Sequence, residues 1–158
     1  MWVYAALAAY QLAAGFQQAQ MIRDNADLQN RINELNAGFA DKDAYEAEKL
    51  GYTEVARYQN VVDTTVGDQR AAYAAQGVDV SYGTAAEVQS ETRLTGLLNM
   101  LDIQKQAREK ALGFKNEARN IRLQGGMARS QAELNAAGAQ NQGIIGAVGT
   151  GLSGYARK

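Results

Sequence analysis

Four carboxylates lie close together near residue 45, and they are the residues of this sequence best suited to acid–base chemistry. They are Asp41, Asp43, Glu46 and Glu48. Paired carboxylic acids can hydrolyse glycosidic bonds when they face each other across a cleft. Residues two apart on a helix point in different directions, however, and no pocket partner accompanies these acids. We therefore interpret them as a solvated helix face and predict no catalytic residue.

The remaining composition argues against other site chemistry. The chain contains no histidine and no cysteine, so it lacks the commonest general base, the thiol nucleophile, and the imidazole and thiolate metal ligands. The sequence shows no glycine-rich phosphate loop, metal-ligand spacing or nucleophile–base pair. We therefore expect a protein that is not an enzyme and that binds neither a metal nor a cofactor.

The absence of proline from 158 residues predicts long helices. Alanine, glutamine, glutamate, arginine and leucine are abundant, and all of them favour the helix. Much of the apolar content is alanine, which buries little area, so a compact globule built from this chain would be weakly held. We expect instead a long, thin assembly that completes its burial with neighbouring chains.

The stretch at residues 77–84 divides the chain into two helical halves. Gly77 can adopt the positive φ that ends a helix, and the valines that follow favour extended backbone. Thr84 and Glu87 form a capping box that would restart the helix. These signals predict a hairpin tip. Its residues are Gly77, Val78, Asp79, Val80, Ser81, Tyr82, Gly83, Thr84 and Glu87.

The predicted fold is all-α, an antiparallel and coiled-coil-like helical hairpin that oligomerises. Helices are expected over residues 17–76 and 85–142, each roughly 90 Å long at about 1.5 Å per residue. Folding at one tip would bring the two apolar terminal segments, residues 1–16 and 143–158, to the same end.

Glycines interrupt both predicted helices. Each glycine in a helix interior costs up to ~1 kcal/mol relative to alanine. We therefore expect kinks or breaks around residues 38–43, near Gly67 and at residues 125–126.

Large apolar residues recur at helical spacing in both halves. On the first helix they step by four, three and four residues, as in a heptad stripe. We interpret the stripes as a helix-packing seam and not as a ligand site. The seam residues are Leu28, Ile32, Leu35, Phe39, Leu94, Leu98, Leu101, Leu112 and Ile121.

Charge divides between the halves. Residues 1–79 carry eleven acids and six bases, a net charge of −5, whereas residues 80–158 carry six acids and ten bases, a net charge of +4. The basic face comprises Lys105, Arg108, Lys110, Lys115, Arg119 and Arg122. Such a helix can meet nucleic-acid phosphates, but no aromatic residue interleaves it for base stacking, so any DNA contact would not be sequence-specific. Anionic lipid head groups are another partner that such a helix can meet. We favour pairing of these bases with acids of the first helix or of a neighbouring chain.

Uncharged stretches at both ends of the chain could contact a membrane or a partner protein. Residues 2–16 would span about 22 Å as a helix, less than the ~30 Å hydrocarbon core of a bilayer. Glycine spacing in residues 143–155 would let helices approach closely. Packing on sister subunits is the alternative to membrane contact. The contact residues are Trp2, Tyr4, Leu7, Tyr10, Leu12, Phe16, Ile144, Ile145, Val148 and Leu152.

The order of these segments has a counterpart in a known family. An alanine-rich apolar N-terminus and a polar helix precede the Gly-Val-Asp-Val-Ser-Tyr-Gly-Thr-Ala tip, which is followed by Val-Gln-Ser-Glu-Thr at residues 88–92. A helix with asparagine and arginine pairs and a glycine-rich C-terminus complete the chain. Over essentially its full length it resembles the internal virion proteins of short-tailed bacteriophages, of the internal virion protein B or ejection-protein type.

The resemblance implies a protein packaged inside the capsid near the portal, together with larger internal core proteins. On infection such proteins leave through the tail and help to form a conduit across the host envelope, and the small one is associated with the outer membrane. We expect a homo-oligomeric ring built through the helices. The alternative is a purely structural core, portal-adjacent or tail-associated virion protein that does not enter membranes.

Overall fold

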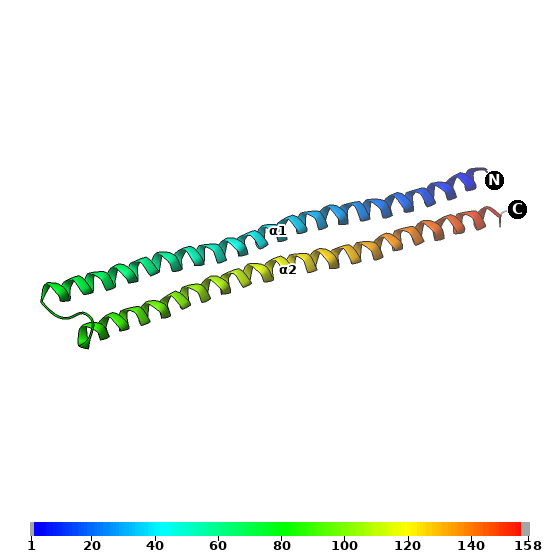
Figure 1. The fold of residues 1–158 in the computed structure, drawn as a ribbon. Coiled ribbons are helices and arrows are strands. Elements are labelled where there is room, and N and C mark those ends of the chain that lie inside the picture. Colours follow the sequence, from blue (N-terminus) through cyan, green and yellow to red (C-terminus); the bar gives the residue numbers. More distant parts are fainter. Residues whose placement is uncertain (1, 156–158) are drawn as a thin grey trace. The chain divides into compact units, whose positions relative to one another are not determined.

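Two helices account for nearly all of the computed structural model, which describes the backbone of residues 2–155 (Figure 1). Helix α1 comprises Trp2–Ala75 and helix α2 comprises Gly83–Tyr155. The helices pack against each other in antiparallel orientation, and residues 2–155 contain no strand. The predicted all-α helical hairpin is confirmed. Side chains are described for residues 3–152.

Both helices continue through the glycines at which breaks were expected. Residues 38–43 and Gly67 are helical within α1, and residues 125–126 are helical within α2. The expectation of helix breaks was wrong because a cost of up to ~1 kcal/mol per glycine is small beside the packing of a long helix. The uncharged ends are likewise continuous with the helices.

The connection between the helices spans residues 76–82. Gly77 has a φ of 75°, as predicted. Its amide donates to the carbonyl of Ala74 and the amide of Val78 donates to the carbonyl of Tyr73, each at 3.0 Å. This hydrogen-bond pair is the Schellman motif, which satisfies two carbonyls that the end of α1 would otherwise leave unpaired.

The start of α2 differs from the prediction. The helix begins at Gly83, whose φ is 68°, so Thr84 lies inside the first turn and not at the capping position. The predicted capping box therefore does not start the helix. Instead, the side-chain amide of the buried Gln89 donates to the carbonyl of Val80 at 3.3 Å and joins the first turns of α2 to the tip.

The chain divides into two compact units, and each contains a segment of both helices. The first unit consists of Met1–Gly38 and Ala118–Lys158, and the second consists of Phe39–Glu117. Each unit is a pair of antiparallel helical segments with its own contacts.

Small side chains form the contact between the helices in both units. Among residues with described side chains, thirteen apolar residues are buried and eleven of them are alanines. In the first unit the buried cluster is Ala19, Ala136 and Ala139, and in the second it is Ala44, Ala47 and Ala111. A Cβ added to Gly15 would lie only 2.9 Å from the Cα of Gly143. The facing backbones therefore approach too closely to admit large side chains.

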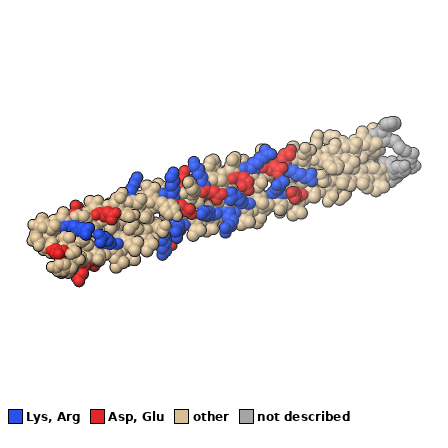
Figure 2. Space-filling view, in the orientation of Figure 1, with Lys and Arg blue, Asp and Glu red and all other residues tan. Residues whose placement is uncertain are grey.

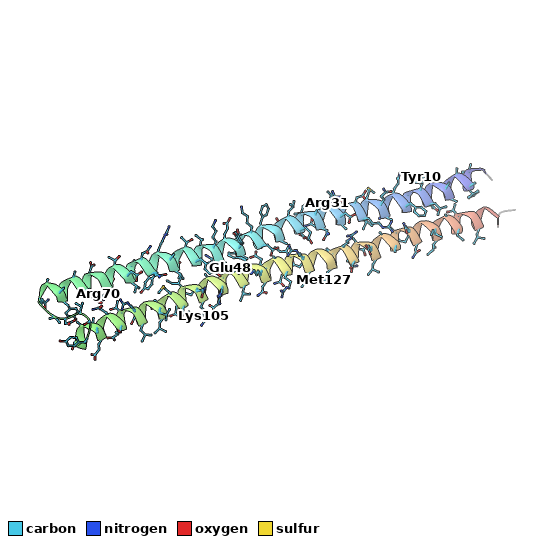
Figure 3. The ribbon with its side chains drawn as sticks, in the orientation of Figure 1. Tyr10, Arg31, Glu48, Arg70, Lys105 and Met127 are labelled. Atoms are coloured by element: carbon cyan, nitrogen blue, oxygen red, sulfur yellow. The ribbon has the colours of Figure 1, made fainter. Side chains whose placement is uncertain are left out.

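The large apolar residues predicted to form the seam do not lie between the helices of the chain. Ile121 is half-buried, whereas the other eight are exposed, with exposed fractions between 49% and 64%. The eight are Leu28, Ile32, Leu35, Phe39, Leu94, Leu98, Leu101 and Leu112. Alanine and glycine occupy the positions that face the other helix, so these eight residues do not pack between the two helices of one chain. Their packing against another chain stays a prediction. Figure 3 shows Tyr10 and Met127 of the first unit pointing away from the neighbouring helix.

Candidate interaction surfaces

Ion pairs connect the acidic first helix to the basic second helix within each unit. In the second unit Lys115 Nζ lies 2.8 Å from Glu48 Oε1. In the first unit Arg122 Nε lies 3.3 Å from Glu34 Oε2, and a guanidinium nitrogen of Arg129 lies 3.5 Å from Asp27 Oδ1. The side chains are partly exposed, so each pair contributes well under ~1 kcal/mol. Their main effect is to favour this register of the helices.

The basic face is therefore interleaved with acids. Lys105 pairs with Glu109 of the same helix at 3.9 Å, while Lys115 and Arg122 pair across the seam. Arg108 lines a groove beside Glu48, and Lys110 and Arg119 are exposed. Figure 2 shows positive and negative side chains intermixed on the visible face. This arrangement favours charge pairing over a continuous nucleic-acid surface.

The carboxylate cluster does not converge on a common site. Glu46 pairs with Lys42 at 3.7 Å, whereas Glu48 pairs with Lys115 of α2. Asp41 and Asp43 are exposed on α1. Within residues 3–152, no group of three or more acids is arranged to hold a metal ion. Of the four acids, Glu48 is half-buried beside α2 and the other three are exposed.

The charge-free ends of the two helices lie side by side in the first unit. Residues 1–22 and 134–156 contain no charged residue, so each uncharged stretch is longer than the segments considered above. Besides the close approach of Gly15 to Gly143, the hydroxyl of Thr150 lies 2.9 Å from Gln11 Oε1 and 2.8 Å from the carbonyl oxygen of Gly146, and it can donate its single proton to either acceptor. The predicted pairing of the two termini thus has a specific polar contact inside an otherwise apolar seam.

Most of the predicted terminal contact residues are exposed. Tyr4 and Leu12 are half-buried, and the side chain of Trp2 lies outside the described part of the chain. The exposed members are Leu7, Tyr10, Phe16, Ile144, Ile145, Val148 and Leu152. Unpartnered apolar side chains on a charge-free helix pair are typical of a surface that meets lipid or another protein.

None of the described helical stretches is apolar and long enough to cross a membrane.

A groove of about 240 Å³ flanks the seam in the second unit. Its lining residues are Glu48, Gly51, Tyr52, Gln104, Ala107, Arg108 and Leu112. Gly51 has no side chain and therefore leaves space at the bottom of the groove, and Tyr52 and Leu112 form its apolar walls. The groove can accept an apolar side chain from another helix. Sequence reasoning missed it because it depends on which residues of the two helices face each other.

An eleven-residue repeat of exposed apolar residues was also missed. On α2 the repeat comprises Leu101, Leu112, Leu123, Leu134 and Ile145. On α1, Tyr10, Met21 and Ile32 share the same spacing, as do Leu28, Phe39, Leu50 and Val61. Eleven residues in three turns give about 3.67 residues per turn, which favours straight or slightly right-handed packing over a left-handed coiled coil. Counting this interval in the sequence, in place of the heptad, would have revealed it.

The Asp79 carboxylate orders the hairpin tip. It accepts hydrogen bonds from the Ser81 hydroxyl at 2.5 Å and from the Ser81 amide at 2.8 Å. These two bonds, the hydroxyl first, lower the pKa of Asp79. Because the folded-state pKa lies below the unfolded one, the stabilising contribution is present above the unfolded pKa and is lost as pH falls through the folded pKa.

We therefore expect the tip to open at acidic pH. Amide hydrogen-exchange protection of Ser81 should decline as the pH falls below the unfolded-state pKa of Asp79. Asp79→Asn should remove this pH dependence, whereas Asp102→Asn on the exposed surface of α2 should preserve it. Unchanged pH dependence in Asp79→Asn would show that another group controls the tip.

Comparisons with known proteins do not assign the chain to a family. It matches no protein-family model, no curated protein and no solved structure. Its function is therefore inferred from the surfaces described above.

Proposed function

We propose that this chain is an internal virion protein of the ejection type from a short-tailed bacteriophage. In this proposal it is packaged near the portal and helps to form a conduit across the host envelope. Two features support the proposal: the order of segments that resembles this family, and the charge-free helix pair of the first unit. The helix pair carries most of the argument, because it gathers the uncharged ends into one exposed apolar surface.

The charge-free pair has dimensions suited to an envelope. Twenty-one uncharged residues at the start of α1, 2–22, correspond to about 32 Å of helix, close to the ~30 Å hydrocarbon core of a bilayer. The helices satisfy their own backbone hydrogen bonds, and the side chains of Gln11 and Thr150 contact each other within the seam. In an oligomer of such helix pairs, apolar side chains such as Val148 can face the lipid. The glutamines and asparagines can then face one another in the interior of the oligomer.

The proposed partners follow from the same role. Copies of the chain form a ring beside the portal and the larger internal core proteins, and the terminal surface contacts the host outer membrane after ejection. Contact with the passing DNA would be electrostatic and independent of base sequence, because lysines and arginines bind phosphates and no aromatic residue interleaves the basic face for base stacking. The protein is located first in the virion and then in the host envelope.

A purely structural role is the second candidate. One observation favours it: the described helices include none that could cross a membrane alone. In this alternative the same apolar residues are buried between copies in a core or portal-adjacent layer and never meet lipid.

Vesicle flotation distinguishes the two roles. The full chain should float with vesicles of phosphatidylethanolamine and phosphatidylglycerol, and Leu7→Asp/Val148→Asp should reduce the floated fraction more than about tenfold. An aspartate at the centre of a bilayer costs roughly 2.5 kcal/mol or more. The matched variant Leu50→Asp/Leu101→Asp, with both changes in the second unit, should float as the parent does. Failure of the full chain to float would exclude the membrane role and favour the structural one. Equal flotation of all three proteins would exclude the charge-free helix pair as the surface that binds lipid.

A further inference from the structure

We propose that copies of this chain associate side by side through the first unit. The outward face of α1 in one copy packs against the outward face of α2 in the next copy. The proposal specifies the interface of the proposed ring and rests on that self-association, but it does not depend on the membrane step.

A single hairpin buries too little apolar surface to be stable without a partner. Its accessible surface is 11383 Å², compared with about 7,700 Å² for a compact monomer of 17.0 kDa. No large side chain among those described is fully buried. Because alanine contributes little burial, a partner surface must supply the rest.

The first unit carries two exposed apolar stripes with the same period. On α1 the stripe is Tyr10, Met21 and Ile32, with exposed fractions of 72%, 59% and 49%. On α2 it is Leu123, Leu134 and Ile145, with exposed fractions of 58%, 69% and 71%. Within each stripe the residues are eleven apart. Two stripes of equal period can remain in contact along their whole length.

Each stripe points away from the seam between the helices. Leu134 lies two residues before the buried Ala136, which places it about 200° around α2 and thus on the opposite side. Met21 lies two residues after the buried Ala19, which places it equally far around α1. The two stripes of one hairpin therefore cannot contact each other, but each is accessible to a neighbouring copy.

The seam contacts place the two stripes at matching levels. Ala19 is buried with Ala136, two positions from Met21 and Leu134 respectively. Gly125 packs against Asn30, again two positions from Leu123 and Ile32. A third contact joins the carbonyl of Gln11, which follows Tyr10 directly, to Gly143, which lies two positions before Ile145. Moving a copy sideways with no axial shift therefore brings Met21 opposite Leu134, Ile32 opposite Leu123, and Tyr10 opposite Ile145.

Charge contributes little to this contact, because most charges of the first unit already pair within the hairpin. The α1 segment carries two bases and three acids, and residues 118–152 of α2 carry three bases and one acid. Of these, Asp27 and Glu34 pair across the seam with Arg129 and Arg122. The equal period and matching levels of the two apolar stripes therefore carry the inferred pairing. A contact between unlike surfaces without axial shift is heterologous and closes into a ring when the rotation allows it.

The natural absence of cysteine permits a direct test. Two full-length single variants, Met21→Cys and Leu134→Cys, are prepared, mixed after reversible dissociation, and oxidised mildly. A disulfide requires Cα atoms within about 7 Å, so the mixture should yield disulfide-linked dimers at least about tenfold above either variant alone. A chain with both substitutions should yield a ladder of higher species. Mixing Met21→Cys with Asn135→Cys, one residue further and about 100° around the helix, is the matched control and should cross-link much less.

Any other result of the cross-linking experiment overturns the inferred interface. Efficient self-cross-linking of Met21→Cys or of Leu134→Cys alone would show contacts between like helices. A chain that sediments as an oligomer but does not cross-link would use another face, and a monomeric chain would have no such interface. Helicity by circular dichroism confirms that the exposed substitutions leave the hairpin folded. Lost cross-linking with retained vesicle flotation overturns only this interface, whereas the reverse overturns only the envelope role.

Discussion

Gly51→Ala is expected to lower the free energy of unfolding by about 1–3 kcal/mol, as overpacking does in a tight core. The added methyl would overlap the Cβ of Ala107 on the facing helix. Neither methyl can rotate away, so the two helices of the second unit must separate. The effect is opposite in sign to intrinsic helix propensity, which favours alanine over glycine by up to ~1 kcal/mol.

Gly67→Ala is the matched control in the same helix and the same unit. A Cβ at Gly67 has no neighbouring atom within 4 Å, so this substitution should raise the free energy of unfolding by up to ~1 kcal/mol. Urea denaturation followed by circular dichroism at a fixed protein concentration measures both changes. If Gly51→Ala stabilised the protein as Gly67→Ala does, the helices could not approach each other as closely as the structure shows.

Gly96 and Val62 form the second sensitive contact, and their effects should be coupled. A Cβ on Gly96 would lie 2.6 Å and 2.9 Å from the two γ-carbons of Val62, which is itself buried. Gly96→Ala alone should therefore lower the free energy of unfolding by about 1–3 kcal/mol. Val62→Ala alone should lower it by roughly 1.5 kcal/mol through lost burial.

The double variant Gly96→Ala/Val62→Ala should be more stable than the sum of the single effects indicates, by at least ~1 kcal/mol. The alanine at position 62 leaves room for the new methyl, so the pair becomes an alanine–alanine contact like those elsewhere in the seam. The same urea titrations on all four proteins complete the cycle. Strictly additive changes would mean that the two residues do not touch.

A seam of small residues has a consequence for assembly. Because alanine and glycine close the hairpin, most large apolar side chains within residues 3–152 remain exposed, including the stripe that contains Leu134. Copies that bind through these side chains stabilise the folded hairpin by mass action. The unfolding free energy should therefore rise with protein concentration.

Several features follow from the sequence alone. The lack of proline and the abundance of alanine predict helices, and Gly77 marks where the first of them ends, because only glycine adopts a positive φ there without strain. The division of charge predicts that acids of α1 meet bases of α2, as Glu48 and Lys115 do. These properties depend on residue type and on nearby residues in the chain, so no knowledge of the packed state is needed to derive them.

Only the tertiary structure decided which face of each helix is buried. Periodicity reveals that Leu28 and Ile32 share a stripe, but it cannot show whether α2 or another chain covers that stripe. Alanines lie on every face of both helices. The buried Ala19 and Ala136 therefore cannot be distinguished in the sequence from the exposed alanines nearby. The choice depends on how closely two backbones can approach, and that distance exists only when Gly15 meets Gly143 and Gly51 meets Ala107.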